Sequence, residues 1–340
     1  YLIERYNQIA PNADLMGYLN GYQGLLTGNS VIIPEKVKAE HNILHDFGGS
    51  PIGNSRVKLT NVEDCVKRGY VDEGSDPLQI AADQLVSDGV NILHTIGGDD
   101  TNTMAAQLSF YLKKNGYDLT VVGLPKTVDN DVFPVAQTLG AWTAAEQSAI
   151  FFENIVNENT TSKRQLIIHE VMGRHCGWLT AKSALDYRKK MKNRSFLPEI
   201  LISKDRWDID AIYIPEEDFD FKKEVSRLKS LMNQKDCVNI FLSEGAGQDS
   251  IIREIESNGQ KVPRDAFGHV RLDEINPGKW FAKQFAKELN AEKTLVQKSG
   301  YFARSSKANK KDLELIRESA FFAAEQAIKG LSGLSGMDED

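Results

Sequence analysis

Two short polar segments of the chain contain residue types that handle phosphate groups. The first is Gly97-Gly98-Asp99-Asp100, and the second, residues 125–131, has the sequence PKTVDND. The glycines lack a Cβ atom, so their backbone N–H groups can approach a ligand closely, and the Asp99 carboxylate suits Mg²⁺ held jointly with phosphate oxygens. Asp129 could accept a proton from an attacking hydroxyl group, and Lys126 could neutralise a phosphoryl group in transfer. Together the two segments indicate phosphoryl-transfer chemistry.

The residues around these segments predict one β-α-β unit. Residues 90–96 (VNILHTI) and 119–124 (LTVVGL) have the apolar character of strands, and residues 101–115 have the periodicity of an amphipathic helix that ends before Gly116. The strands of such a unit are parallel, and ligands bind at the carboxyl ends of strands in open α/β sheets. Both polar segments are therefore expected at one edge of a sheet, beside the positive end of the helix dipole.

Each segment alone has a simpler interpretation. Gly-Gly-Asp-Asp is often a turn followed by a helix N-cap, and residues 125–131 are rich in amino acids that form turns. Because the two segments follow adjacent strands, a phosphate site explains them better than two unrelated turns do.

Two more strands of the second half lead into polar residues. Residues 164–171 predict a buried strand that is followed by Met172-Gly173-Arg174, and residues 237–243 predict another that is followed by Glu244. A planar guanidinium such as that of Arg174 suits a phosphoryl group, and a carboxylate such as Glu244 can accept hydrogen bonds from sugar hydroxyls. A solvated turn is the alternative for Glu244.

Other segments give weaker signals. A glycine-rich loop at residues 48–56 ends in Arg56, and residues 299–305 (SGYFARS) have the composition of an ordinary turn. We expect a long helix over residues 138–157 with Phe151 and Ile155 on its apolar side, a strand over residues 199–203, and a solvated Glu216 after a strand at residues 210–214.

Composition limits the classes of protein that the chain can belong to. It has 340 residues, of which 41% are apolar, so it can form a large core and more than one domain. The net charge is −7 and no basic run alternates with aromatic residues, which argues against nucleic acid as a partner. We expect no membrane span and no secretory signal, and the odd, widely spaced Cys65, Cys176 and Cys237 favour a reducing cytoplasm over a disulfide framework or zinc site.

At these motifs the chain resembles the phosphofructokinase family. The similarity lies in Gly-Gly-Asp, Thr-Val-Asp-Asn-Asp, Met-Gly-Arg, the glutamate after a buried strand, and Tyr-x-x-Arg, in the family's order along nearly the whole chain. It implies an α/β fold with two Rossmann-like domains of largely parallel sheets. It also implies transfer of a phosphoryl group to the 1-hydroxyl of fructose 6-phosphate, giving fructose 1,6-bisphosphate, with Mg²⁺.

The resemblance also implies roles for individual residues. Asp129 would be the base, Lys126 and Arg174 would stabilise the transition state, Asp99 would bind the metal, and Gly97, Gly98 and Arg56 would lie at the donor phosphates. The sugar phosphate would be bound by residues of four segments, with Lys298 adding charge nearby: Thr127, Val128, Asp129, Met172, Gly173, Arg174, Glu244, Tyr301, Phe302, Ala303 and Arg304.

Two positions bear on the phosphoryl donor. Members that use ATP usually have glycine where this chain has Asp100 and Lys126, so the chain resembles the pyrophosphate-dependent branch, whose reaction runs readily in both directions. A carboxylate at Asp100 would repel the α-phosphate of a nucleotide, and Lys126 would supply the charge that a phosphate leaving group needs. The alternatives are an ATP-dependent enzyme, a non-catalytic regulatory subunit that binds sugar phosphate, and a lipid or nicotinamide-nucleotide kinase, which would share only the Gly-Gly-Asp loop.

The same resemblance suggests the domain organisation. We expect a donor domain at residues 1–137, a sugar-phosphate domain at residues 138–298, and a return segment at residues 299–340 with the substrate loop and a final helix. We also expect a homodimer or homotetramer, and a longer protein with the family's first glycine-rich phosphate loop before Tyr1. Many members of the family have an arginine at the start of the strand predicted here over residues 164–171, and this arginine reaches the sugar phosphate of a neighbouring subunit. In this chain the arginine is either Arg164 or is missing, with Gln165 in its place.

Overall fold

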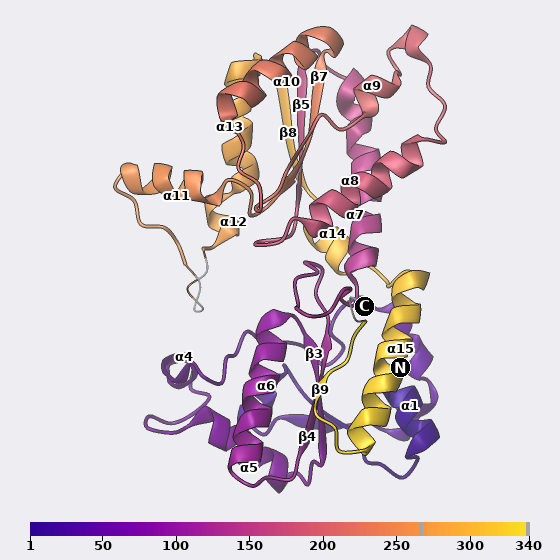
Figure 1. The fold of residues 1–340 in the computed structure, drawn as a ribbon, viewed down its shortest axis with the longest axis vertical. Coiled ribbons are helices and arrows are strands. Elements are labelled where there is room, and N and C mark those ends of the chain that lie inside the picture. Colours follow the sequence, from indigo (N-terminus) through magenta and orange to yellow (C-terminus); the bar gives the residue numbers. More distant parts are fainter. Residues whose placement is uncertain (265–267, 269, 338–340) are drawn as a thin grey trace. The chain divides into compact units, whose positions relative to one another are not determined.

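A computed structural model describes residues 1–264, 268 and 270–337. In it the chain folds into two compact units (Figure 1). Unit 1 consists of Tyr1–Thr127, Val132–Gly140 and Lys307–Asp340. Unit 2 consists of Val128–Asp131 and Ala141–Ser306. The chain therefore passes from one unit to the other more than once, and each unit is described by itself below.

Unit 1 contains the predicted β-α-β unit. Strands β3 (Ile92–Gly97) and β4 (Thr120–Pro125) are parallel, with Gly97 opposite Pro125, and helix α6 (Asp99–Lys114) connects them. A two-residue strand, β9 (Gly333–Leu334), extends the sheet in parallel on the other side of β4. The helix begins at Asp99 rather than at residue 101, because carboxylates are favoured in the first turn of a helix, next to its unpaired N–H groups.

Helices pack around this sheet and a small hairpin. The core of unit 1 joins buried side chains of α6 to those of α5 (Pro77–Ser87), among them Leu85, Leu108 and Leu112. Asp76 caps α5 as predicted, because its carboxylate accepts a hydrogen bond from Leu78 N. The other elements of unit 1 are β1 (Met16–Tyr18) and β2 (Ser30–Ile32), which are antiparallel, with α1 (Leu2–Ile9), α2 (Tyr22–Leu26), α3 (Glu35–Ala39), η1 (His41–Asp46), α4 (Val62–Lys67) and α15 (Lys310–Ile328).

Unit 2 is built on a four-stranded parallel sheet. Its strand order is β6 (Ala211–Tyr213), β7 (Cys237–Ser243), β5 (Gln165–Val171) and β8 (Lys293–Lys298). Every residue of β5 and β7 is buried, as expected for central strands covered on both faces. The mixed α/β architecture with parallel sheets agrees with the fold class predicted from the sequence.

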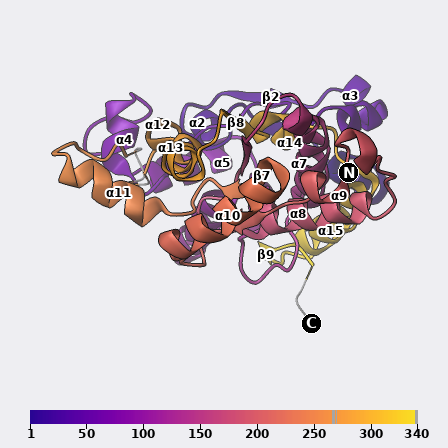
Figure 2. The ribbon, with the colours of Figure 1, turned by 90° about the horizontal axis from the view of Figure 1, so that it is seen from above.

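The two faces of this sheet are covered by different helices. On one face, α7 (Ala141–Ile155) and α8 (Trp178–Met191) lie side by side (Figures 1 and 2) and pack with Ile167 and Phe241. On the other face, α10 (Phe221–Lys235) and α13 (Pro277–Leu289) pack with Leu166 and Ile240. This alternation follows from the two-residue period of a strand. The remaining helices are η2 (Val156–Thr160), η3 (Pro198–Ile200), α9 (Lys204–Trp207), α11 (Gln248–Ser257), α12 (Leu272–Ile275) and α14 (Gly300–Arg304).

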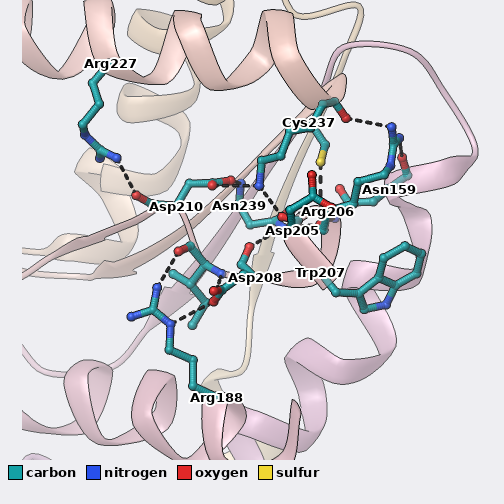
Figure 3. Close-up of polar contacts among 12 residues, drawn as sticks. Asn159, Arg188, Asp205, Arg206, Trp207, Asp208, Asp210, Arg227, Cys237 and Asn239 are labelled. Atoms are coloured by element: carbon teal, nitrogen blue, oxygen red, sulfur yellow. Dashed lines mark hydrogen bonds and ion pairs between the residues drawn. The ribbon is translucent and has the colours of Figure 1, made fainter. Parts of the chain in front are cut away.

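A buried polar network holds the amino ends of β6 and β7 (Figure 3). Asn159 Nδ2 donates to the carbonyl of Arg206 at 2.6 Å and to Asn239 Oδ1 at 3.0 Å, and Asn239 N donates to Asp210 Oδ2 at 2.8 Å. Lys235 Nζ lies 2.8 Å from Asp210 Oδ1, and both of these side chains are buried. This network fixes the end of the sheet opposite to the one where β7 delivers Glu244.

Several sequence predictions are wrong or shifted. Residues 199–203 form no strand: the first two belong to the short helix η3, and Leu201, which ends this helix, has φ +70°. Helix α7 begins at Ala141. Ile155 packs against the core as predicted, but the fully buried aromatic residue of the helix is Phe152 rather than Phe151. Residues 300–304 form the helix α14 instead of a turn.

The two units also differ from the predicted domain boundaries. Residues 128–131 belong to unit 2 rather than to the donor domain, and residues 138–140 belong to unit 1 rather than to the sugar-phosphate domain. The substrate loop up to Ser306 belongs to unit 2 rather than to the return segment. The last three residues of that segment, 338–340, lie outside the described residues. Within the part of the chain that the structure describes, no helix has the length and apolar character that a membrane span requires.

Candidate functional site

The candidate residues form two groups, and each group is described within its own unit. In unit 1, β3 ends at Gly97 and α6 begins at Asp99, so the Gly-Gly-Asp-Asp segment is a strand-to-helix turn as predicted. Asn102 Nδ2 donates hydrogen bonds to the carbonyls of Gly97 at 2.8 Å and Gly98 at 2.9 Å. A Cβ atom at Gly97 would lie only 2.4 Å from Thr101 Oγ1, so the turn requires glycine there.

The first residues of the second polar segment, 125–127, belong to unit 1 and lie against the first segment. Lys126 N donates a hydrogen bond to the carbonyl of Gly97 at 2.7 Å, which continues the register of β3 and β4 beyond the strands. Thr127 in turn is held by Thr138 Oγ1, which donates to the Thr127 carbonyl at 2.8 Å. The structure thus brings Gly97, Gly98, Lys126 and Thr127 together, whereas Arg56 lies exposed in the irregular segment before α4 and takes no part in these hydrogen bonds.

The acidic residues of this turn fit a magnesium ion that is shared with a ligand. Asp99 and Asp100 are both exposed in the first turn of α6. No cluster of three or more histidine, cysteine or carboxylate side chains within residues 1–264, 268 and 270–337 could hold a metal by protein ligands alone. Mg²⁺ is commonly bound through one or two carboxylates and completed by phosphates and water, which is the arrangement that these residues can supply.

In unit 2, the loop of residues 172–177 carries Arg174, and we name it the arginine loop. Gly173 has φ +126°, a conformation that L side chains rarely adopt, and its carbonyl accepts a hydrogen bond from Ser243 Oγ at 2.6 Å. Its N–H donates to Glu244 Oε1 at 3.3 Å. The end of β7 therefore holds the beginning of the arginine loop.

The far end of the arginine loop is held by Glu216. Gly177 N donates to Glu216 Oε1 at 2.6 Å, at the start of α8. The prediction of a solvated Glu216 is therefore incomplete: the side chain is exposed, yet its carboxylate caps a helix, where negative charge is favoured. The position of Glu216 could have indicated a role at the site. Glu216 follows the carboxyl end of β6, just as Arg174 follows that of β5 and Glu244 that of β7.

Gly245 fits directly beneath the arginine loop, and this contact gives a test of the loop's packing. A Cβ atom at Gly245 would lie 1.8 Å from the carbonyl oxygen of Arg174. We expect Gly245→Ala to lower the free energy of unfolding by about 1–3 kcal/mol, because backbone must move to accept the methyl group. Thermal and urea unfolding measure this loss, with Gly49→Ala as the control, since a Cβ atom at Gly49 would meet nothing within 4 Å. Equal stability of the two variants would contradict the described loop.

The charged side chains of unit 2 interact around Asp129. Burial first, and then the neighbouring Asp131, raise the pKa of Asp129 to about 6, while Arg304 and Arg174 oppose the rise. Burial and the charge of Asp129 likewise raise the pKa of Glu244 to about 7. The structure thus gathers Asp129, Arg174, Glu244 and Arg304 into one electrostatic group, as the sequence suggested.

The substrate-loop residues lie on the short helix α14. Tyr301 is 74% exposed and Phe302 is 49% exposed, whereas Ala303 is buried in the core with its side chain turned away from solvent. The guanidinium of Arg304 lies 5.9 Å from the centre of the Tyr301 ring. Tyr301 and Arg304 are therefore free to meet a ligand, while Ala303 anchors the helix.

Two basic residues near the site are engaged in other contacts. Arg164 has φ +46° and lies at the amino end of β5, where its guanidinium donates hydrogen bonds to Asn290 O at 2.8 Å and Asn233 Oδ1 at 2.9 Å. It is therefore placed at the opposite end of the strand from Arg174. Lys298 Nζ lies 2.7 Å from Glu170 Oε1, a buried carboxylate to which none of the sequence motifs points.

The chain is similar to known proteins in sequence and in fold. The phosphofructokinase family profile matches residues 5–327. A protein of Methylotuvimicrobium alcaliphilum named pyrophosphate–fructose 6-phosphate 1-phosphotransferase is 57% identical over 339 residues, which is all of this chain and 83% of the relative. A protein of the same name from Propionibacterium freudenreichii is 54% identical, over 100% of this chain and 84% of the relative. The solved structure of a pyrophosphate-dependent phosphofructokinase from Nitrosospira multiformis shares the fold, with a TM-score of 0.68, 19% identity, and coverage of 97% of this chain and 72% of that one.

Proposed function

The chain belongs to the phosphofructokinase family, and we propose that it transfers a phosphoryl group from pyrophosphate to the 1-hydroxyl of fructose 6-phosphate. The products are fructose 1,6-bisphosphate and phosphate, and the reaction runs in both directions in glycolysis and gluconeogenesis. The observation that carries this proposal is 57% identity, along the full chain, to an enzyme named for this reaction. The presence of Asp100 and Lys126 in the donor half supports the same donor.

Asp129 is the base in this mechanism. It accepts the proton of the 1-hydroxyl as that oxygen attacks the phosphorus atom of pyrophosphate, and phosphate leaves. Burial and Asp131 raise the pKa of Asp129 to about 6. At neutral pH the carboxylate is therefore still ionised, while it binds a proton more strongly than an exposed aspartate does, which suits general-base catalysis.

The sugar phosphate is bound by the residues around Asp129. Because burial and Asp129 raise the pKa of Glu244 to about 7, this carboxyl group carries a proton in part of the molecules at neutral pH, and it can both donate to and accept from sugar hydroxyls. Arg304 and Tyr301 bind the 6-phosphate, and Arg174 stabilises the phosphoryl group in transfer. The remaining contacts to the sugar come from Thr127, Val128, Met172, Gly173 and Phe302, while Ala303, which is buried in the core, anchors α14.

The donor is bound by the residues of unit 1. Backbone N–H groups of Gly97 and Gly98 approach the pyrophosphate, Lys126 neutralises the leaving phosphate, and Arg56 adds positive charge. Asp99 would hold Mg²⁺ jointly with pyrophosphate oxygens, and the bound ion would supply positive charge that offsets the charge of the phosphates. Asp100 excludes a nucleotide by repelling its α-phosphate.

A coupled assay of the full protein tests the donor and the acceptor together. With fructose 6-phosphate and Mg²⁺, we expect turnover with pyrophosphate and at least about a hundredfold lower kcat/KM with ATP, because a misplaced charge pair costs several kcal/mol. Activity with ATP alone would overturn the assignment of pyrophosphate as the donor, but it would not affect the assignment of the sugar-binding residues. Binding of fructose 6-phosphate by a folded protein that is inactive with both donors would instead identify a regulatory subunit.

The likeness to these enzymes also supports a homodimer or homotetramer that works in the cytoplasm. Light scattering on the purified protein tests the assembly, since a mass of one subunit would overturn it. Lipid and nucleic acid have no role in the proposed reaction.

A further inference from the structure

The arginine loop and the substrate loop leave unit 2 from two neighbouring strands. Parallel strands β5 and β8 pair along their length, and the last pair in register is Glu170 with Lys298. Beyond this pair, the chain after β5 enters the arginine loop, and the chain after β8 enters α14 with Tyr301 and Arg304. Whatever fixes Glu170 and Lys298 therefore fixes the point from which both loops start.

Glu170 is unusual because its carboxylate is buried at this point, with both oxygens occupied. Its side chain is 4% exposed; Oε1 lies 2.7 Å from Lys298 Nζ, and Oε2 accepts a hydrogen bond from Gly278 N at 2.8 Å. Gly278 lies in the first turn of α13, where negative charge is favoured. A Cβ atom at Gly278 would lie 2.3 Å from Glu170 Oε2, so the helix approaches this carboxylate as closely as glycine permits.

The contacts continue into the residue that precedes α14. Ser299 is 1% exposed; its N–H donates to the carbonyl of Glu170 at 3.3 Å, and its Oγ lies 3.1 Å from Ser148 Oγ on α7. The ammonium group of Lys298 forms an ion pair with Glu170, although the lysine side chain is 41% exposed. The lysine predicted to add charge for the sugar phosphate is thus already paired with a carboxylate.

We propose that Glu170 and Lys298 form a positioning pair that sets the orientation of α14, and through it the binding of the sugar 6-phosphate by Tyr301 and Arg304. This inference builds on the proposed function, since it assigns a role toward the same acceptor. The pair acts on acceptor binding more than on the transferred group, because Lys298 leads directly into α14. The arginine loop after Glu170 is held separately, by Ser243 and Glu244 at its beginning and by Glu216 at its end.

Steady-state kinetics of three variants test the pair. We expect Glu170→Gln, Lys298→Met and the double variant each to raise the KM for fructose 6-phosphate about tenfold or more, with kcat and the KM for pyrophosphate changed less than about threefold, since a small misplacement of a binding group costs up to about a hundredfold. The double variant should be no worse than the worse single one, because the two changes break one interaction. Lys293→Met is the matched control, as it removes an exposed ion pair with Glu158 at the other end of β8.

Two results would overturn the positioning role. If Lys298 bound the phosphate directly, Lys298→Met would raise the KM, while Glu170→Gln would leave it unchanged or lower it by freeing the lysine. Additive effects in the double variant would mean that the two residues act independently.

Hydrogen exchange separates this inference from the proposed function. Backbone amides of residues 300–304 should exchange faster in the Glu170→Gln/Lys298→Met variant than in Lys293→Met, whether or not the protein turns over fructose 6-phosphate. An inactive wild-type protein would overturn the proposed reaction, whereas equal exchange in the two variants would overturn the positioning pair.

Discussion

Replacing Asp129 with asparagine is expected to lower kcat for phosphoryl transfer from pyrophosphate by about 10²–10⁴-fold, because the amide cannot accept the proton of the 1-hydroxyl. The KM for fructose 6-phosphate should change little, since asparagine has nearly the same size and can still accept a hydrogen bond. Initial rates at saturating pyrophosphate measure both constants.

The pH dependence identifies the cause of this loss. The base acts when it is deprotonated, so wild-type activity should rise with pH through about 6, the value to which burial and Asp131 raise the pKa of Asp129. Asp131→Asn is the control: removal of its negative charge lowers the pKa of Asp129, so the rise should move to lower pH while the plateau stays. The rise should be absent from the residual activity of Asp129→Asn. If Asp129→Asn kept more than about a tenth of the wild-type kcat, this result would contradict the assignment of Asp129 as the base.

The second large effect is expected from the donor residues. Changing Asp100 and Lys126 together to glycine should lower kcat/KM for pyrophosphate by about 10²–10³-fold, the usual cost of removing one group that stabilises a transition state. The same double variant should gain measurable use of ATP, because the carboxylate that repels a nucleotide α-phosphate is gone. Parallel assays with the two donors measure the switch.

The structure explains why this variant should remain folded. Lys126 is tied to Gly97 through its backbone N–H, which glycine retains, and Asp100 is exposed in the first turn of α6. Asp100→Asn separates charge from bulk, since it removes the repulsion and keeps the shape. Unchanged pyrophosphate activity in the double variant would sink the assignment of these residues to the donor.

The sequence predicted those parts of the fold in which local pattern and tertiary packing agree. Strands β5 and β7 are mostly apolar and are buried on both faces, and α5 has a polar cap, a proline in its first turn and a spaced apolar face. Parallel pairing then places polar residues at the carboxyl ends of strands, which is why the candidate site could be found without coordinates.

The predictions failed where the outcome depends on partners distant in the chain. Residues 199–203 have the apolar content of a strand, but the described structure pairs them only in an isolated bridge between Leu197 and Ile202, and Ile200 is 61% exposed. Strand β9 is two residues long, too short for any periodicity, and it exists because Gly333 and Leu334 pair with β4.

The residues that hold the site loops in place could not be predicted from the sequence either. Gly245 lies about 70 residues after Arg174 in the chain and touches its carbonyl, and no local pattern reports such a contact. Glu170 lies in the buried strand predicted over residues 164–171, and only the approach of α13 and Lys298 shows that its carboxylate is held from two sides.

The path of the chain between the two units limits how enzymes of this kind can be recombined. Val128–Asp131, which includes the proposed base, belongs to unit 2, although Val132–Gly140 of unit 1 separates it from the rest of that unit. A hybrid gene that borrowed only residues 141–306 from a relative would combine one parent's base with the other parent's arginine and substrate loops. The shortest continuous segment that contains the whole of unit 2 is residues 128–306, and it carries nine residues of the other unit with it. Crossovers placed after Thr127 and after Ser306 should therefore yield more active hybrids than a crossover after Gly140.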